Sequence, residues 1–222
     1  MSSTAGYPSD CEITAGLRQR AALRGQAREE RGYAWKNCLP RAREISLLLL
    51  DVDGVLTDAS ILYTDSGTEF KAFSTRDGLG IRLLQEAGVE VGVITARSSE
   101  AVRRRAADLG LAHVVQGARD KLAAYERILR EQNLRPAQVA YMGDDWLDLP
   151  LLVRVGLAAT VADAVAEVKA VAHYVTRQPG GKGAVRELCE LLIEARGAHE
   201  QLLARYCPEH PALGGGGEGS SR

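Results

Sequence analysis

The stretch Leu47-Leu48-Leu49-Leu50-Asp51-Val52-Asp53-Gly54 decides how the chain is expected to fold. Four consecutive leucines suit a strand that is buried on both faces, as in a parallel sheet covered by helices. Asp51 and Asp53 follow two positions apart, so they share one face where the strand ends. Gly54 lets the chain turn sharply out of the sheet. Because open parallel sheets bind ligands beyond the carboxyl ends of their strands, this pattern predicts a site for a divalent cation and an anionic substrate rather than a simple Asp-rich turn.

Strand and helix patterns alternate from Ile45 to Arg196, which predicts an α/β fold, a Rossmann-like parallel sheet between layers of helices. Two β-rich runs around a Gly-containing turn predict a β-hairpin at 60–64 and 69–73. Further strands are expected at 90–95, 113–116, 139–142, 157–161 and 173–175. Helices are expected at 76–86, 98–109, 120–132, 145–153, 164–170 and 184–196, with Pro150 as a possible kink in the fourth.

The whole-chain properties are those of an ordinary globular protein of 222 residues. A formal net charge of −1 gives no reason to expect nucleic acid or a membrane as a partner, and no apolar run approaches the length of a membrane span. The polar first ten residues lack the apolar core of an export signal. None of the four cysteines is spaced like a metal ligand or a redox motif, so we expect reduced thiols and a cytoplasmic location.

Both ends of the chain differ from the central pattern. Residues 1–43 are basic and poor in apolar residues, so they are predicted to form a disordered arm. Residues 197–222, with four consecutive glycines from Gly214, are predicted to form a flexible tail. The predicted folded domain is therefore 44–196.

Polar residues at other strand ends suit phosphoryl transfer. Thr95 ends one expected strand, Asp144 follows another, and Lys121 begins a helix, all on the carboxyl side of the sheet. Mg²⁺ held by Asp51 and Asp144 would cancel the repulsion between a carboxylate and a phosphate dianion, while Thr95 and Lys121 would hold the transferring oxygens. Asp51 would attack phosphorus, and Asp53 would protonate the leaving group and then activate water.

Four segments resemble the motifs of the haloacid dehalogenase superfamily of phosphatases: 51–58, Thr95, Lys121 and 143–148. The resemblance covers about residues 45–196. It implies four catalytic residues: Asp51, Asp53, Thr95 and Lys121. It also implies that Mg²⁺ is bound by the carboxylates of Asp51 and Asp144 and by the main-chain carbonyl of Asp53. Asp145 and Asp148 are expected to orient neighbouring groups, Asp145 as a helix cap.

The intervals from Asp51 to Thr95 and from Lys121 to Asp144 are too short to hold a cap domain. Among capless members, the chain is similar to the 3-deoxy-D-manno-octulosonate 8-phosphate phosphatases through segments 73–82, 94–97, 143–148 and 180–187. This similarity implies a homotetramer in which hairpins form a central barrel and a neighbouring subunit covers each active site. Residues expected to contact the substrate are Asp53, Lys71, Arg76, Asp77, Gly78, Arg97, Lys121 and Lys182.

The resemblance implies Mg²⁺-dependent hydrolysis of 3-deoxy-D-manno-octulosonate 8-phosphate through a phospho-aspartyl intermediate, giving the free sugar acid for lipopolysaccharide biosynthesis. A phosphatase of N-acylneuraminate 9-phosphate, or of a related acidic sugar phosphate, is the alternative enzyme. An alternative of another class is a non-catalytic oligomerisation module related to the C-terminal domain of acylneuraminate cytidylyltransferases. The complete set of carboxylates favours an enzyme. Lys182 stands where we expect Arg in many relatives, and it lacks the bidentate geometry of Arg toward a carboxylate.

Overall fold

The computed structural model describes residues 32–206, of which residues 34–199 form one compact unit. Its centre is a six-stranded parallel sheet in the order β5-β4-β1-β6-β7-β8, as the alternating pattern predicts. The first strand lies in the middle of this sheet, and all four of its leucines are fully buried. The strands are β1 (Leu47–Leu50), β4 (Glu90–Ile94), β5 (His113–Val115), β6 (Val139–Met142), β7 (Leu157–Thr160) and β8 (Tyr174–Val175).

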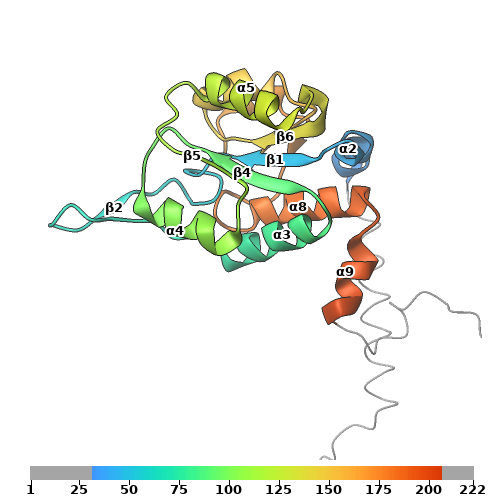
Figure 1. The fold of residues 1–222 in the computed structure, drawn as a ribbon, viewed down its shortest axis with the longest axis horizontal. Coiled ribbons are helices and arrows are strands. Elements are labelled where there is room, and N and C mark those ends of the chain that lie inside the picture. Colours follow the sequence, from blue (N-terminus) through green and yellow to red (C-terminus); the bar gives the residue numbers. More distant parts are fainter. Residues whose placement is uncertain (1–31, 207–222) are drawn as a thin grey trace, which may run out of the picture. The chain divides into compact units, whose positions relative to one another are not determined.

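Helices cover both faces of the sheet, which confirms the predicted layers (Figure 1). One face carries α3 (Thr75–Glu86), α4 (Glu100–Leu109) and α8 (Ala184–Ala195), and the other carries α5 (Lys121–Gln132). Next to α5 lies the short helix α6 (Leu149–Leu152), and next to α6 lies α7 (Ala166–Val171). A 3₁₀ turn, η1 (Pro136–Gln138), precedes β6.

The predicted helix at 145–153 is divided. It consists of a 3₁₀ turn, η2 (Trp146–Asp148), followed by α6, and Pro150 lies at the second position of α6. An N–H at that position has no partner within a helix, so proline is accommodated there without a kink. The expectation of one kinked helix is therefore wrong, and Asp148 lies at the junction of two short elements.

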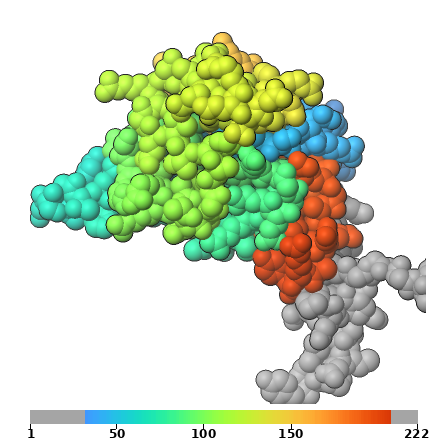
Figure 2. All heavy atoms as spheres, in the orientation of Figure 1, coloured from blue at the N-terminus to red at the C-terminus, as the bar shows by residue number. Residues whose placement is uncertain are grey.

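The predicted hairpin is confirmed as β2 (Leu62–Tyr63) and β3 (Glu69–Phe70), paired antiparallel in a sheet of their own. Figures 1 and 2 show it projecting away from the body of the unit. Within residues 32–206 nothing larger is inserted between β1 and α3 or between α5 and β6, so this part of the chain has no cap domain.

Two predicted boundaries need correction. Residues 33–43 are not a disordered arm but a helix, α2 (Tyr33–Arg43), whose buried Trp35, Cys38 and Ala42 share one face. Trp35 packs edge-on against Tyr174, with ring centroids 5.9 Å apart. Likewise, the predicted flexible tail begins with a helix, α9 (His199–Tyr206). The rest of the predicted arm and tail lies outside the described residues.

None of the helices within residues 32–206 is both long and apolar enough to cross a membrane.

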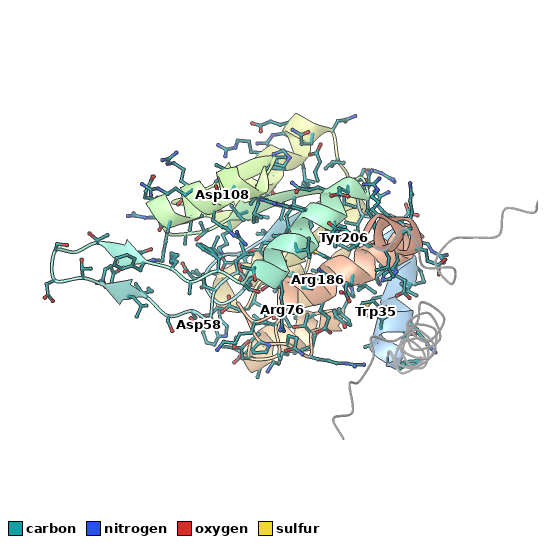
Figure 3. The ribbon with its side chains drawn as sticks, turned by 90° about the horizontal axis from the view of Figure 1, so that it is seen from below. Trp35, Asp58, Arg76, Asp108, Arg186 and Tyr206 are labelled. Atoms are coloured by element: carbon teal, nitrogen blue, oxygen red, sulfur yellow. The ribbon has the colours of Figure 1, made fainter. Side chains whose placement is uncertain are left out.

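Asp77 joins the two helices that lie side by side on one face, α3 and α8, which carry Arg76 and Arg186 in Figure 3. Its buried carboxylate accepts hydrogen bonds from the main-chain N–H groups of Gly183 (3.2 Å) and Arg186 (2.7 Å) at the start of α8. Burial nevertheless raises the pKa of Asp77. Asp77, which we expected to contact substrate, thus fixes the N-terminus of a helix.

Replacing Asp77 with alanine should lower the free energy of unfolding by about 1–3 kcal/mol, because two buried N–H groups would lose their acceptor. Urea denaturation at neutral pH measures the change. Asp65→Ala, in the exposed hairpin turn, is the control and should shift stability by less than about 0.5 kcal/mol. Equal unfolding midpoints for the two variants would contradict this role of Asp77.

Candidate functional site

The carboxyl edge of the sheet gathers side chains from separate elements. Asp51 follows β1, Asp144 follows β6, Thr95 follows β4, and Lys121 is the first residue of α5. The N–H of Asp51 donates to the carbonyl of Met142 (2.9 Å), which extends the β1–β6 pairing to the site. Asp51, Thr95 and Lys121 are buried. The structure therefore brings Asp51, Asp144 and Lys121 together, as the sequence predicts, and places Thr95 at the end of the strand next to β1.

Three carboxylates crowd this edge. Asp51, Asp144 and Asp148 each offer one oxygen, and these three oxygens lie within 4.8 Å of one another. Glycines make room for them: a Cβ at Gly54 would lie 2.0 Å from Oδ2 of Asp144, and a Cβ at Gly143 would lie 2.3 Å from Cγ of Asp148. Gly54 also has φ +87°, which other residues rarely adopt. Side chains at these two positions would push the cluster apart.

Asp148 has all of its acceptor positions in use. Its fully buried carboxylate accepts at Oδ1 from Lys121 Nζ (2.6 Å) and from the Tyr141 hydroxyl (2.5 Å). Its Oδ2 accepts from the N–H groups of Asp144 (2.9 Å) and Asp145 (3.2 Å). Asp148 therefore orients its neighbours, which leaves Asp51 and Asp144 as the carboxylates able to bind a cation.

Lys121 is the cation of this cluster. Its ammonium lies 2.9 Å from Oδ2 of Asp51 and 2.6 Å from Oδ1 of Asp148. Burial opposes its charge, but the two carboxylates outweigh that effect and raise the pKa of Lys121. One lysine therefore holds two buried carboxylates and stays protonated.

One ammonium does not neutralise three carboxylates. Burial and the charge of Asp148 raise the pKa of Asp51 to about 6, against the opposing effect of Lys121. Burial, Asp51 and Asp148 raise the pKa of Asp144 to about 7. A divalent cation between Asp51 and Asp144 would relieve this repulsion, so the arrangement suits a metal with oxygen ligands.

Asp53 faces the hairpin. Its carboxylate pairs with Lys71, whose side chain is 0% exposed and also lies 3.3 Å from Glu69. Arg97, whose side chain is 41% exposed, lies 3.9 Å from Asp53 and donates to Glu69 (2.7 Å) and to the Tyr63 hydroxyl (2.9 Å). Lys71, directly after β3, and Arg97, after β4, thus surround Asp53, and the hairpin residues Glu69 and Tyr63 hold these two cations.

The remaining predicted substrate contacts are dispersed. Arg76 is exposed, whereas Gly78 packs against the guanidinium of Arg105, so a Cβ there would lie 2.2 Å from its nitrogen. Lys182 belongs to a loop that docks on the turn after Asp53. In that loop the N–H of Gly181 donates to the carbonyl of Val55 (2.9 Å), and a Cβ at Gly180 would lie 1.8 Å from the carbonyl oxygen of Gly54.

Sequence reasoning missed three polar residues. Tyr141 lies in an apolar strand and reads as core, although its hydroxyl binds Asp148. Glu69 and Tyr63 lie on the two hairpin strands and read as ordinary hairpin residues. The sequence signal for Tyr141 is a hydroxyl in a strand otherwise made of Val139, Ala140 and Met142, since a buried phenol needs a polar partner.

Comparison with known proteins identifies relatives over most of the chain. Residues 110–188 match the family model of haloacid dehalogenase-like hydrolases. The chain is 47% identical over 158 residues to the 3-deoxy-D-manno-octulosonate 8-phosphate phosphatase of Yersinia pestis, covering 71% of this chain and 84% of that protein.

Comparison with solved structures also identifies phosphatases of this kind. A crystal structure of the 3-deoxy-D-manno-octulosonate 8-phosphate phosphatase from Moraxella catarrhalis, in complex with magnesium ion, phosphate ion and a KDO molecule, has a TM-score of 0.75 at 39% identity. The match covers 77% of this chain and 98% of that one. A probable YrbI-family phosphatase from Pseudomonas syringae has a TM-score of 0.76 at 44% identity, covering 78% and 98%.

Changing Asp144 to asparagine should stabilise the metal-free protein at pH 8 by about 1–2 kcal/mol, a gain limited by the partial exposure of this carboxyl group. The raised pKa values of Asp51 (about 6) and Asp144 (about 7) mean that these groups favour folding while protonated. Their contribution is complete below the pKa of an unfolded carboxyl and is lost as pH rises through these values. At pH 5 the variant should therefore differ little from the wild type.

Urea denaturation in the presence of a chelator, at both pH values, measures this effect. Asp145→Asn is the matched control, because Asp145 is exposed and asparagine keeps a side-chain oxygen that can accept from the neighbouring N–H of Trp146 (2.7 Å). A gain for Asp144→Asn that is equal at the two pH values would show that charge repulsion is not its cause.

Proposed function

The chain belongs to the family of the 3-deoxy-D-manno-octulosonate 8-phosphate phosphatases, within the haloacid dehalogenase-like hydrolases, and from this premise we propose that it hydrolyses the phosphate monoester of 3-deoxy-D-manno-octulosonate 8-phosphate. The observation that carries the proposal is the buried cluster at the end of β1, where Lys121 contacts Asp51 while Asp144 lies beside it. A nucleophilic carboxylate, a cation site and a fixed ammonium in one place suit phosphoryl transfer.

The donor set fits Mg²⁺, because oxygen ligands suit this ion and the two carboxylates repel each other without a cation. We propose that Asp51, Asp144 and the main-chain carbonyl of Asp53 hold it. When bound, it would offset the repulsion between the carboxylate and the phosphate dianion. The relative from Moraxella catarrhalis, solved with a magnesium ion and a phosphate ion, supports this assignment.

In the first step, a carboxylate oxygen of Asp51 attacks phosphorus and forms an acyl phosphate. The bond from phosphorus to the sugar oxygen breaks, its electron pair stays on that oxygen, and Asp53 supplies the proton that the leaving group needs. The ammonium of Lys121 and the hydroxyl of Thr95 hold the transferring oxygens. Asp51 is fixed for attack because its main-chain N–H and its Oδ2 are both hydrogen-bonded.

In the second step, Asp53 takes a proton from a water molecule, and the water oxygen attacks phosphorus. The bond between phosphorus and Asp51 then breaks, which releases inorganic phosphate and restores both carboxyl groups to their starting states. Asp53 acts first as acid and then as base, so its carboxyl group must keep one position through both steps. Its contacts with Lys71 and Arg97 provide that restraint.

The charges around Asp53 also suggest how an acidic sugar is recognised. The side chain of Lys71 is fully buried and pairs with Asp53 and Glu69, so we propose that it positions Asp53 and does not reach the sugar. Arg97 is partly exposed on the same network, so its guanidinium is the group we propose for the sugar carboxylate. Arg76, Lys121 and Lys182 remain proposed contacts of the phosphate or sugar.

The alternatives differ in what supports them. A phosphatase of N-acylneuraminate 9-phosphate would use the same cluster, so only substrate preference separates it from the main proposal. A non-catalytic oligomerisation module would have no need for the buried carboxylates, which destabilise a metal-free fold at neutral pH.

We further propose that the chain works in the cytoplasm and that its product enters lipopolysaccharide synthesis. Within the part of the chain that the structure describes, Cys38 and Cys189 are free buried thiols, which suits a reducing compartment.

Phosphate release with Mg²⁺ should be at least about 100-fold faster in kcat/KM for 3-deoxy-D-manno-octulosonate 8-phosphate than for N-acetylneuraminate 9-phosphate, a difference of about 2.7 kcal/mol in transition-state binding. Asp51→Asn should abolish turnover of both compounds, because an amide cannot form the acyl phosphate. Asp108→Asn is the matched control at an exposed position of α4 and should keep wild-type activity.

Similar slow turnover of both sugar phosphates would retain a phosphatase but reject this substrate. Wild-type protein as inactive as Asp51→Asn on a panel of sugar phosphates would reject the enzyme and favour the oligomerisation module.

We also propose that the chain forms a homotetramer through its hairpin, on which Leu62, Tyr63 and Phe70 are 58%, 61% and 53% exposed. Figure 2 shows the hairpin projecting from the unit, and apolar side chains exposed on such an element are typical of a surface that another chain covers. Light scattering should give a tetramer for the wild type and a smaller species for Phe70→Glu. Val153→Glu, at an exposed apolar position directly after α6, should leave the tetramer intact. A fully active wild-type monomer would contradict the proposal.

A further inference from the structure

Tyr141 is a buried polar residue that the phosphatase mechanism above does not use. It lies in β6 between β1 and β7, with Leu49 and Ala158 as its partners across the sheet. Its side chain is fully buried. A phenol hydroxyl in such a position costs free energy unless it is hydrogen-bonded, and here it donates to Oδ1 of Asp148 at 2.5 Å. The hydroxyl thus reaches the polar cluster from inside the core.

Asp148 connects this hydroxyl to the proposed metal ligand Asp144 and to Lys121. Through Oδ2 it holds the N–H groups of Asp144 and Asp145, which sets where the Asp144 carboxylate lies. Through Oδ1 it holds the Lys121 ammonium at 2.6 Å. A shift or rotation of this one carboxylate would move a proposed metal ligand and a proposed phosphate contact together.

The hydroxyl of Tyr141 also limits how strongly Asp148 attracts Lys121. Oδ1 shares its negative charge between two donors, and the ammonium remains 2.9 Å from Asp51. Lys121 Nζ also lies 3.5 Å from the hydroxyl oxygen of Tyr141, so the Asp148 carboxylate, the Lys121 ammonium and the Tyr141 hydroxyl all contact one another. Without the hydroxyl, Lys121 would be the sole donor to Oδ1 and would be drawn toward Asp148, away from Asp51.

We propose that Tyr141 is a positioning residue of the phosphatase reaction, whose hydroxyl fixes the Asp148 carboxylate and thereby sets Lys121 and Asp144 for phosphoryl transfer and Mg²⁺ binding. The inference rests on the proposed function for its kinetic consequence. Its consequence for Mg²⁺ binding can be measured without any substrate.

The test compares Tyr141→Phe with Tyr125→Phe. The control removes the same hydroxyl from a buried tyrosine on α5, the helix that begins with Lys121. Among the described residues, the Tyr125 hydroxyl has no hydrogen-bond partner. Any effect of the smaller side chain on packing is therefore shared, whereas the loss of a contact to the site is confined to Tyr141→Phe.

For Tyr141→Phe, kcat should fall about tenfold with KM within about threefold of the wild type, because the hydroxyl acts on groups that hold the transition state. The dissociation constant of Mg²⁺, measured by calorimetry on the metal-free protein, should rise about fivefold. Tyr125→Phe should leave both quantities within about twofold of the wild type.

A purely structural hydroxyl would lower the melting temperature and leave both kcat and the Mg²⁺ dissociation constant of the folded protein unchanged, and that result would overturn the proposal. So would an equal loss in Tyr125→Phe. If the wild type turns over no phosphate ester, the proposed function fails and the Mg²⁺ measurement alone decides the role of Tyr141. A wild-type protein that binds no Mg²⁺ would overturn both.

Discussion

The contact of one buried lysine with two buried carboxylates is the interaction on which the site depends. Lys121 lies between Asp51 and Asp148, and the third carboxylate, Asp144, lies within the same cluster without an ammonium of its own. Burial alone would drive these groups toward their neutral forms, and Lys121 opposes that for Asp51 only in part. The fold therefore carries an excess of negative charge at the carboxyl edge of its sheet, which is a cost to stability and the basis of cation binding.

Backbone contacts keep this charge in place. The turn after β1 can pass beside Asp144 only because Gly54 has no side chain, and the loop before α8 rests on that turn through Gly180 and Gly181. Asp77 in turn anchors the start of α8. The strand β1 and the helix α8, distant in sequence, are thus joined by glycines and by one buried carboxylate.

Local sequence patterns predict the sheet and the cluster because each strand, and the polar residues at its end, can be recognised separately in the sequence. Four leucines before Asp51 indicate a central buried strand, and strand ends converge in any parallel sheet. What the sequence could not reveal depends on packing between distant segments. Only three residues of α2 are buried, so its sequence shows little apolar periodicity. The sequence around Lys71 does not distinguish this buried side chain from an exposed lysine. The hydroxyl of Tyr141 finds its partner, Asp148, only when η2 folds against β6.

The hairpin connects the chemistry to the assembly that we propose. Glu69, on β3, holds both Lys71 and Arg97, while Tyr63, on β2, holds Arg97 from the other strand. Asp53 belongs to the turn after β1, yet its charged neighbours depend on a two-stranded element that projects from the unit. Two isolated short strands are marginally stable, so contacts that hold the hairpin would also hold in position the carboxylate that we propose as acid and base. This dependence gives a capless phosphatase a physical reason for the assembly that we propose, through the same element that surrounds Asp53, the proposed proton-transfer residue.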